Sequence, residues 1–206
     1  MQTQRPVPES SEQAWDDWAG GVLAAFDQFQ LLCAVRKGAW GVEALNERIA
    51  EALVRRGLLE QAHGWYEGRP VLVTRNDYSL GLMNGDIGIA LRLPEPPEVP
   101  GAPMRQVLRV VFPRNDGSGA LRHILPSRLS AVETVFAMTV HKSQGSEFRH
   151  AALVLPESHQ AVSRELLYTA ITRARQRFTL AGTAGALAQP ARPTVRASGL
   201  AKRLHG

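Results

Sequence analysis

Two segments in the last third of the chain constrain its fold most. In residues 136–148, FAMTVHKSQGSEF, an apolar run leads into a polar loop, and residues 165–177, ELLYTAITRARQR, resemble a short helix that carries arginines. A buried strand that ends in a polar loop and is followed by a helix is typical of α/β proteins. The two segments therefore predict an α/β sheet with an edge that handles phosphate groups.

The composition favours a folded protein with an anionic partner. At 206 residues with 44% hydrophobic side chains, the chain can bury a core as one domain with an insertion or as two small domains. Its formal net charge of +5 favours nucleic acid or an acidic surface. No acidic residue follows Glu165, whereas the basic residues Arg173, Arg175, Arg177, Arg192, Arg196, Lys202 and Arg203 do. We therefore expect an electropositive C-terminal end.

The single cysteine and the N-terminus bear on the compartment. Because Cys33 is the single cysteine, a disulfide framework is excluded. Its position in an apolar run predicts a buried, inert thiol, which fits a reducing compartment. The N-terminus is polar and contains proline, unlike a signal peptide, and no apolar run approaches the roughly 20 residues of a membrane helix. We expect a cytoplasmic protein without a membrane partner.

Hydrophobic periodicity divides the chain into an α/β frame around a small β unit. It predicts helices over residues 12–27, 42–56 and 163–175, and strands over residues 29–35, 70–74, 86–93, 106–112, 120–125, 132–140, 151–155 and 178–181. The strands between 70 and 125 are short, with turns such as Asn84-Gly85, and predict a β-barrel-like unit. The proline-rich residues 94–103 predict an exposed loop, and residues from 189 onward a basic tail.

Two sequence signals of a nucleotide or metal site are missing from these 206 residues. There is no G-x-x-x-x-G-K-[ST] phosphate loop, and no predicted strand ends in paired acids that would hold Mg²⁺. His141 has no second His or Cys at metal-ligand spacing, so we predict no metal site in the chain. Any nucleotide that the chain handles must then be held mainly by another domain.

Four motifs occur in an order that matches a known family. They cover residues 31–46 (LLCAVRKGAWGVEALN), 65–90 (WYEGRPVLVTRNDYSLGLMNGDIGIA), 137–148 (AMTVHKSQGSEF) and 165–175 (ELLYTAITRAR). Together they resemble the C-terminal part of a superfamily 1 DNA helicase, and more narrowly the RecD type, the α subunit of exodeoxyribonuclease V. The resemblance covers nearly the whole chain.

The resemblance implies a domain organisation. Such motors have two RecA-like domains with ATP between them, and this chain resembles the second, with an SH3-like barrel inserted in it. It implies that residues 1–67 form the first part of the RecA-like domain, residues 68–131 the barrel, and residues 132–206 the second part with the basic tail. The phosphate loop and the Mg²⁺-holding acid belong to the first domain, so we expect no ATPase from this chain alone.

The resemblance also assigns residues to the nucleotide. It implies that Arg173 and Arg36 reach the γ-phosphate, where a planar guanidinium can bridge phosphoryl oxygens. Gly145 would allow the backbone to approach the nucleotide, and Glu147 would accept a hydrogen bond from a ribose hydroxyl. Gln144 would lie between the nucleotide and the DNA strand. By itself, Glu147 also suits a helix N-terminus, and an isolated Arg-x-Arg is more often a solvated face.

Single-stranded DNA is the implied partner of four further residues. Thr139 and His141 would contact the DNA backbone without reading sequence, and Arg75 and Asn76 would guide the strand along the barrel. The implied enzyme is an ATP- and Mg²⁺-dependent 5′–3′ DNA helicase that works with the β and γ subunits in double-strand break repair and recombination. A stand-alone RecD-like helicase and a non-catalytic DNA-binding module remain the alternatives.

Overall fold

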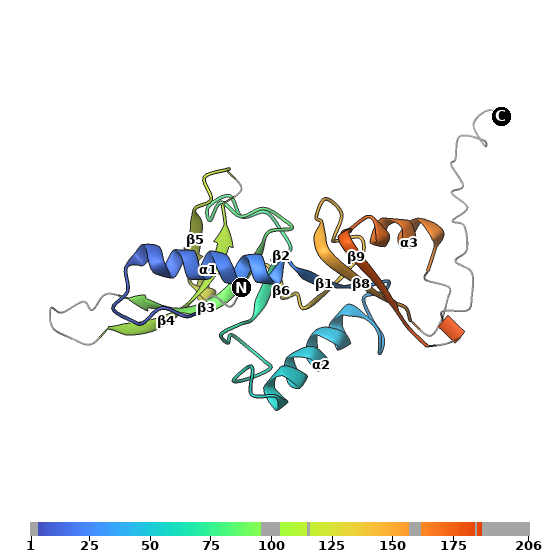
Figure 1. The fold of residues 1–206 in the computed structure, drawn as a ribbon, viewed down its shortest axis with the longest axis horizontal. Helices are drawn as coiled ribbons and strands as arrows, with labels where there is room; N and C mark the ends of the chain where they lie inside the picture. The colour runs from blue at the N-terminus through green and yellow to red at the C-terminus, as the bar shows by residue number, and fades with distance from the viewer. Residues whose placement is uncertain (1–3, 96–103, 115, 157–161, 184, 187–206) are drawn as a thin grey trace.

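A parallel sheet forms one half of the molecule (Figure 1). The computed structural model describes residues 4–95, 104–114, 116–156, 162–183 and 185–186. The sheet order is β7-β1-β8-β9, with β1 at Phe29–Cys33, β7 at Ala137–Thr139, β8 at Phe148–Val154 and β9 at Ala174–Ala181. All three pairings are parallel, which confirms the predicted α/β class.

An antiparallel sheet of five strands forms the other half. Its order is β5-β4-β3-β2-β6, with β2 at Pro70–Val73, β3 at Ile87–Glu95, β4 at Arg105–Pro113, β5 at Leu121–Ile124 and β6 at Val132–Thr134. A 3-10 turn, η1 (Pro126–Arg128), precedes β6. The predicted strands between 70 and 125 are confirmed, with small differences at their ends. The predicted loop at 94–103 falls mostly outside the described residues, and the predicted tail from 189 onward lies wholly outside them.

The predicted strand over residues 132–140 is wrong in one respect, because the chain changes sheets within it. β6 pairs with β2 in the antiparallel sheet, whereas β7 pairs with β1 in the parallel sheet. Between them Val135 is fully buried, and the Phe136 carbonyl accepts a hydrogen bond from Gln30. A continuous apolar run cannot reveal this change of partner, because both strands are partly buried.

Helices α1, α2 and α3 of the described residues pack on the two sheets. α1 (Glu12–Phe26) begins at Ser11, whose hydroxyl accepts from the Ala14 amide, and it packs Trp15 and Leu23 on the antiparallel sheet. α2 (Val42–Arg55) packs on β1 and β7. α3 (Arg164–Ile171) begins at Ser163 and packs beside β8. The predicted helix over 163–175 ends early, because residues from Ala174 pair with β8 as β9 instead.

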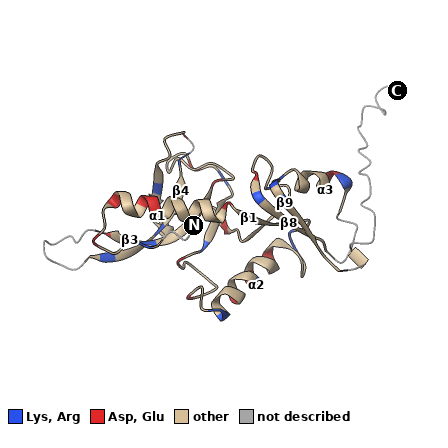
Figure 2. Ribbon diagram, viewed as in Figure 1, with Lys and Arg blue, Asp and Glu red and all other residues tan. Residues whose placement is uncertain are grey.

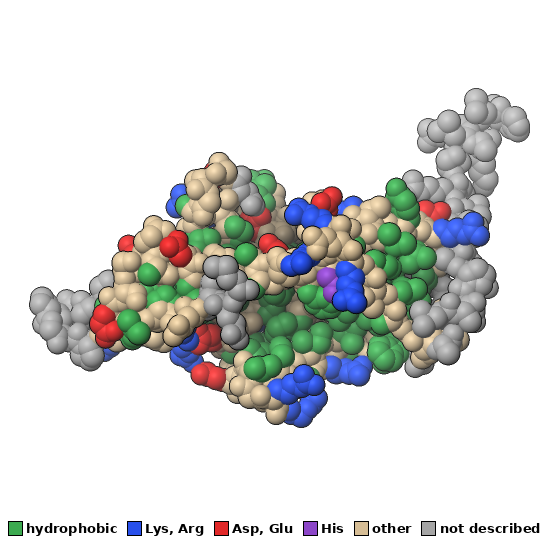
Figure 3. All heavy atoms as spheres, in the orientation of Figure 1, with side chains coloured by type: hydrophobic (Ala, Val, Ile, Leu, Met, Phe, Trp, Pro, Cys, Tyr) green, Lys and Arg blue, Asp and Glu red, His purple; other side chains and the backbone are tan. Residues whose placement is uncertain are grey.

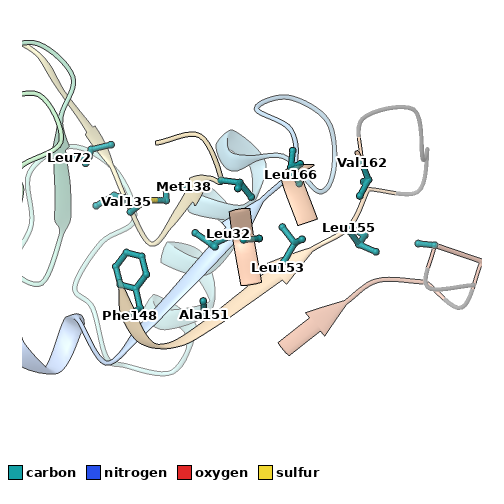
Figure 4. Packing of buried hydrophobic residues seen from close by; sticks show 13 residues of the cluster. Leu32, Leu72, Val135, Met138, Phe148, Ala151, Leu153, Leu155, Val162 and Leu166 are labelled. Atoms are coloured by element: carbon teal, nitrogen blue, oxygen red, sulfur yellow. The ribbon is translucent and has the colours of Figure 1, made fainter. Parts of the chain in front are cut away.

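The parallel half has a closely packed core (Figure 4). The side chains of Leu32, Met138, Leu153 and Leu166 gather between the sheet and α3. Cys33 is completely buried, as predicted, and burial raises the pKa of its thiol to about 12. Among the described residues, no helix is both long and apolar enough to cross a membrane.

Candidate functional site

The loop over residues 140–147 runs from the end of β7 to the start of β8. Its first turn is closed by hydrogen bonds from the Lys142 and Ser143 amides to the Thr139 carbonyl, at 3.1 and 3.3 Å. The Ser143 hydroxyl is fully buried and donates to the Val140 carbonyl at 2.7 Å. Gly145 has a φ of +89°, a conformation that favours glycine. The loop is therefore tightly folded.

Arg173 holds this loop from the end of α3. Its Nη1 donates to the Ser146 carbonyl at 2.9 Å and to the Ser143 carbonyl at 3.4 Å, and its Nε donates to the Thr169 carbonyl at 3.2 Å. None of the ion pairs found among the described residues includes Arg173. Carbonyl groups orient a guanidinium without neutralising it, so the positive charge of Arg173 stays available to an anion.

Glu147 and Arg175 form an ion pair beside Arg173 in sequence. The Arg175 Nε lies 3.0 Å from the Glu147 carboxylate, and the two side chains are 66% and 54% exposed. Both residues line a cavity of about 360 Å³ together with Asp27. Burial raises the pKa of Asp27, and the charge of Arg175 lowers it by a smaller amount. Glu147 is thus an exposed acceptor at the edge of a polar cavity.

The antiparallel sheet reaches the same end of the loop. Gln144 and Gly145 line a second cavity, of about 460 Å³, with the turn over residues 84–86 and the end of α1. The Asp86 amide donates to the Met83 carbonyl at 3.0 Å across Asn84-Gly85, which confirms the predicted turn there, and the Gly85 amide donates to the Val73 carbonyl at 2.9 Å. The structure thus gathers Gln144, Gly145, Glu147 and Arg173 around one end of the 140–147 loop.

Arg36 lies at the other end of the parallel strands. Cys33, three residues before Arg36, pairs with Thr139 and with Val154 at the ends of β7 and β8. Arg173 directly precedes β9, whose first residue pairs with the first residue of β8. β8 is seven residues long, which separates the two ends by about 20 Å. The 140–147 loop links the two arginines, since Lys142 shares Glu133 with Arg36 and the next residue, Ser143, accepts from Arg173.

The charge of Arg36 is already offset by two carboxylates. Its guanidinium lies 3.1 Å from Glu133 and 3.3 Å from Glu43. The hydrogen bond from Arg36 to Glu133 is the largest influence on the Arg36 pKa and raises it. Lys142 pairs with the same Glu133 carboxylate. Sequence reasoning gave Glu133 no role, and nothing in its surroundings, an acid within the run VETVF, signals one.

The predicted DNA-binding residues fall into two groups. Thr139 and His141 lie at the Arg36 end of the strands, where the Thr139 hydroxyl accepts from the Lys142 amide and His141 is exposed. Arg75 is exposed on the segment after β2. Asn76 accepts from the Asn84 amide at 2.7 Å and donates to the Tyr78 hydroxyl, so its amide organises the hairpin.

Charged residues are distributed over both halves of the molecule (Figure 2). On the face shown in Figure 3, basic side chains lie around a histidine, next to a hydrophobic area. One group in the described parts of the chain has metal-ligand geometry: Glu47, Glu51 and His63 hold their ligand atoms within 4.8 Å of one another. It contains none of the residues predicted for nucleotide or DNA.

Proteins similar to the chain include helicases and subunits of the RecBCD enzyme. Residues 134–181 match the family described as UvrD-like helicase C-terminal domain. The chain is 42% identical over 184 residues to the RecBCD enzyme subunit RecD of Mycobacterium tuberculosis (strain CDC 1551 / Oshkosh), covering 88% of this chain and 30% of the relative. It is 35% identical over 208 residues to that subunit of Haemophilus influenzae, covering 99% of this chain and 29% of the relative.

A further relative is a helicase with a different name. The chain is 36% identical over 163 residues to the ATP-dependent RecD2 DNA helicase of Deinococcus radiodurans, covering 76% of this chain and 20% of the relative. The chain thus spans less than a third of the length of each of these curated relatives. The names of all three relatives refer to RecD. Two of them are subunits of the RecBCD enzyme, whereas the name of the third mentions no enzyme complex.

Proposed function

The chain belongs to the RecD-type superfamily 1 helicases as their C-terminal part, and we propose from this that it is the second motor domain of an ATP-dependent DNA helicase. The enzyme translocates 5′ to 3′ along DNA in double-strand break repair and recombination. The observation that carries the proposal is the Arg173 guanidinium, which carbonyl groups of the 140–147 loop orient and which forms no ion pair with a carboxylate in the described part of the chain.

ATP would meet this chain at the Arg173 end of the loop. The residues there fit the phosphate and ribose ends of a nucleotide: a guanidinium with free charge, a glycine backbone and an exposed carboxylate, from Arg173, Gly145 and Glu147. Gln144 lies beside them and connects this end to the rest of the loop. ATP with Mg²⁺ would supply the phosphoryl group. We assign the Mg²⁺ and the other phosphate contacts to a first motor domain.

DNA would lie at the opposite ends of the strands. Thr139 and His141 would contact phosphates there, and Arg75 and Asn76 would contribute from the antiparallel sheet. Arg36 keeps the γ-phosphate role that the family resemblance implies, and its guanidinium is linked to Arg173 through Glu133, Lys142 and the next residue, Ser143. One loop then faces nucleotide at its end and DNA at its start.

We propose the domain division that the family resemblance implies. Residues 68–131 would be an SH3-like barrel inserted between the two parts of a RecA-like domain, 1–67 and 132–206, except that β6 (residues 132–134) pairs with β2 and so belongs with the inserted sheet. The antiparallel sheet supports this, since its strands have a core of their own that includes Val71, Ala90, Val110 and Phe112. α1 packs on this sheet as well as beside β1, so it would connect the two domains.

Arg173→Ala in the intact enzyme is the experiment that tests the nucleotide role. We expect the DNA-stimulated ATPase rate to fall by about 10³-fold or more, because the guanidinium offsets charge that develops during phosphoryl transfer. Arg177→Ala is the matched control, since it removes an exposed arginine of β9 four residues away and should leave the rate nearly unchanged. Equal losses in both variants would refute the assignment of Arg173.

Purification separates the two helicase alternatives. A subunit of exodeoxyribonuclease V, the alternative supported by the RecD relatives, should co-purify with β and γ subunits as a heterotrimer. A stand-alone helicase, supported by the RecD2 relative, should bind neither. If the intact protein bound single-stranded DNA without any ATPase, the non-catalytic binding module would be the better description.

A further inference from the structure

We propose that Tyr78, on a small hairpin of the antiparallel half, is a platform on which one base of single-stranded DNA stacks. This rests on the proposed function, in which Arg75 and Asn76 of the same segment serve DNA binding. It adds a contact with a base to the contacts with phosphates. It also makes Asn76 a positioning residue that acts through Tyr78.

Tyr78 has the highest exposed fraction among the large apolar side chains in the described part of the chain, at 78%. Met83, on the other arm of the same hairpin, is 46% exposed. Single exposed apolar side chains are common on protein surfaces and by themselves indicate no function. Tyr78 differs from such a residue because hydrogen bonds fix the backbone around it and orient its ring.

The backbone of the hairpin over residues 76–84 is fixed by pairing and by burial. Asp77 and Leu82 exchange two main-chain hydrogen bonds, at 2.8 and 2.9 Å. The Asp77 carboxylate also accepts from the Leu80 amide at 3.2 Å. Leu82 is buried and packs together with Leu80 in the core of the antiparallel sheet. The hairpin therefore presents Tyr78 to solvent from an anchored backbone.

The ring of Tyr78 is oriented through its hydroxyl group. Asn76 Nδ2 donates to the Tyr78 hydroxyl at 3.1 Å, and Asn76 Oδ1 accepts from the Asn84 amide at 2.7 Å. The hydroxyl end of the ring is thereby tied to the other arm of the hairpin, although the side chain as a whole stays exposed. A ring that is already held in place loses less conformational entropy when a base stacks on it.

Two arginines adjoin the hairpin and suit the phosphates on either side of a stacked base. Arg75 is exposed and lies three residues before Tyr78. Arg122 of β5 donates to the Gly81 carbonyl of the hairpin. Neither arginine takes part in the ion pairs found among the described residues. Proteins that bind single strands without reading sequence combine such cations with aromatic rings on which bases stack.

Tyr78→Ala tests the proposal through the affinity of the full chain for a fluorescent oligo-dT. We expect binding to weaken by about fivefold or more, because one stacked base is lost. Tyr78→Leu keeps an apolar side chain without an aromatic ring and should lose about as much, whereas Tyr78→Phe keeps the ring and should stay within about twofold of the wild type. Tyr168→Ala is the matched control, since Tyr168 is 70% exposed on α3, and should also stay within about twofold.

A strand of abasic sites separates stacking from phosphate contacts, because it has the backbone charge of oligo-dT but no bases. We expect the wild type to bind it at least about fivefold more weakly than oligo-dT, and Tyr78→Ala to reduce this difference by the factor that the substitution costs on oligo-dT. Tyr78→Ala should leave the slope of log affinity against log salt unchanged, since the ring neutralises no phosphate. Arg75→Ala should reduce that slope by about 0.7.

The outcomes separate this inference from the proposed function. If the wild-type chain binds oligo-dT and Tyr78→Ala binds as tightly as Tyr168→Ala, the platform is refuted while the DNA-binding function stands. The same holds if Tyr78→Leu binds like the wild type, because an apolar contact would then suffice. If the wild-type chain does not bind oligo-dT, the DNA role of this segment falls and the platform falls with it.

Two further measurements control for folding and for a protein partner. Thermal melts show whether each variant keeps its fold, and if Tyr78→Ala does not, the comparison of Tyr78→Phe with Tyr78→Leu decides. In the intact enzyme, Tyr78→Ala should still co-purify with the same subunits as the wild type. Loss of a subunit with oligo-dT affinity unchanged would overturn the proposal, because the hairpin would then be a protein interface.

Discussion

Gly145 has a backbone φ of +89°, which residues with a side chain rarely adopt, and its surroundings are open. No atom outside its chain neighbours lies within 4 Å of where a Cβ would be. The cost of a side chain at this position is therefore one of backbone conformation and not of crowding. At a loop that must approach a nucleotide, this leaves space beside the backbone for a ligand.

Gly145→Ala should lower the free energy of unfolding by about 1–2 kcal/mol, because alanine disfavours this conformation. In a thermal melt this corresponds to a decrease of about 2–8 °C. Gly20→Ala is the matched control: Gly20 lies within α1, also with nothing within 4 Å, and alanine should stabilise the helix by about 0.5–1 kcal/mol. Changes of the same sign in both variants would contradict this account of Gly145.

At the scale of single residues, sequence predicts types of environment better than partners. The apolar run around Cys33 correctly predicted a buried thiol. The order of motifs pointed to Arg173, but the groups that hold it are main-chain carbonyls of Ser143 and Ser146, which leave no trace in side-chain identity. Glu133 could not be predicted, because its partners become neighbours only after two sheets are assembled.

At the scale of elements, Asn46 of α2 closes the outer edge of β7. Its Nδ2 donates to the Ala137 carbonyl and its Oδ1 accepts from the Ala137 amide, both at 2.9 Å. The side-chain amide thus pairs with β7 as a neighbouring strand would. Since Asn46 is buried and the described part of this sheet ends at β7, the amide satisfies backbone groups that would otherwise be buried without partners.

Asn46→Ala should therefore lower the free energy of unfolding by about 3 kcal/mol, since it leaves a buried N–H and a buried C=O of Ala137 unpaired. Chemical denaturation of the purified chain measures this directly. Glu47→Ala changes the next residue, which is exposed on the same helix, and should stay within about 0.5 kcal/mol of the wild type. If the two substitutions cost the same, Asn46 would not be the residue that secures β7.

Periodicity predicted most elements but not where the chain changes partner. The helix expected to continue to residue 175 ends at Ile171, although Arg and Ala are good helix formers, because residues from Ala174 gain a parallel pairing with β8. In the same way, residues 132–140 look like one strand and form two, in different sheets. Both errors arise where long-range pairing overrides local preference.

At the scale of the whole molecule, the 140–147 loop connects two regions at opposite ends of the parallel strands. Its start lies with Thr139 and Arg36, and its end lies with Glu147 and Arg173. Sequence placed all of these residues in one family pattern but could not separate the two ends, because spacing along the chain does not give the direction of each strand in the sheet. The structure makes that separation testable.

We expect substitutions at the two ends to act on different ligands. His141→Ala should weaken oligo-dT binding by about threefold to tenfold, because it removes a phosphate contact, and should leave ATP-analogue affinity of the intact enzyme unchanged. Arg173→Gln should do the reverse: glutamine retains a donor for the Ser146 carbonyl but lacks the charge that a γ-phosphate needs. Titrations of both variants with each ligand give four affinities. If Arg173→Gln weakened oligo-dT as much as His141→Ala does, the loop would respond as one unit, and nucleotide and DNA could not be assigned to separate ends.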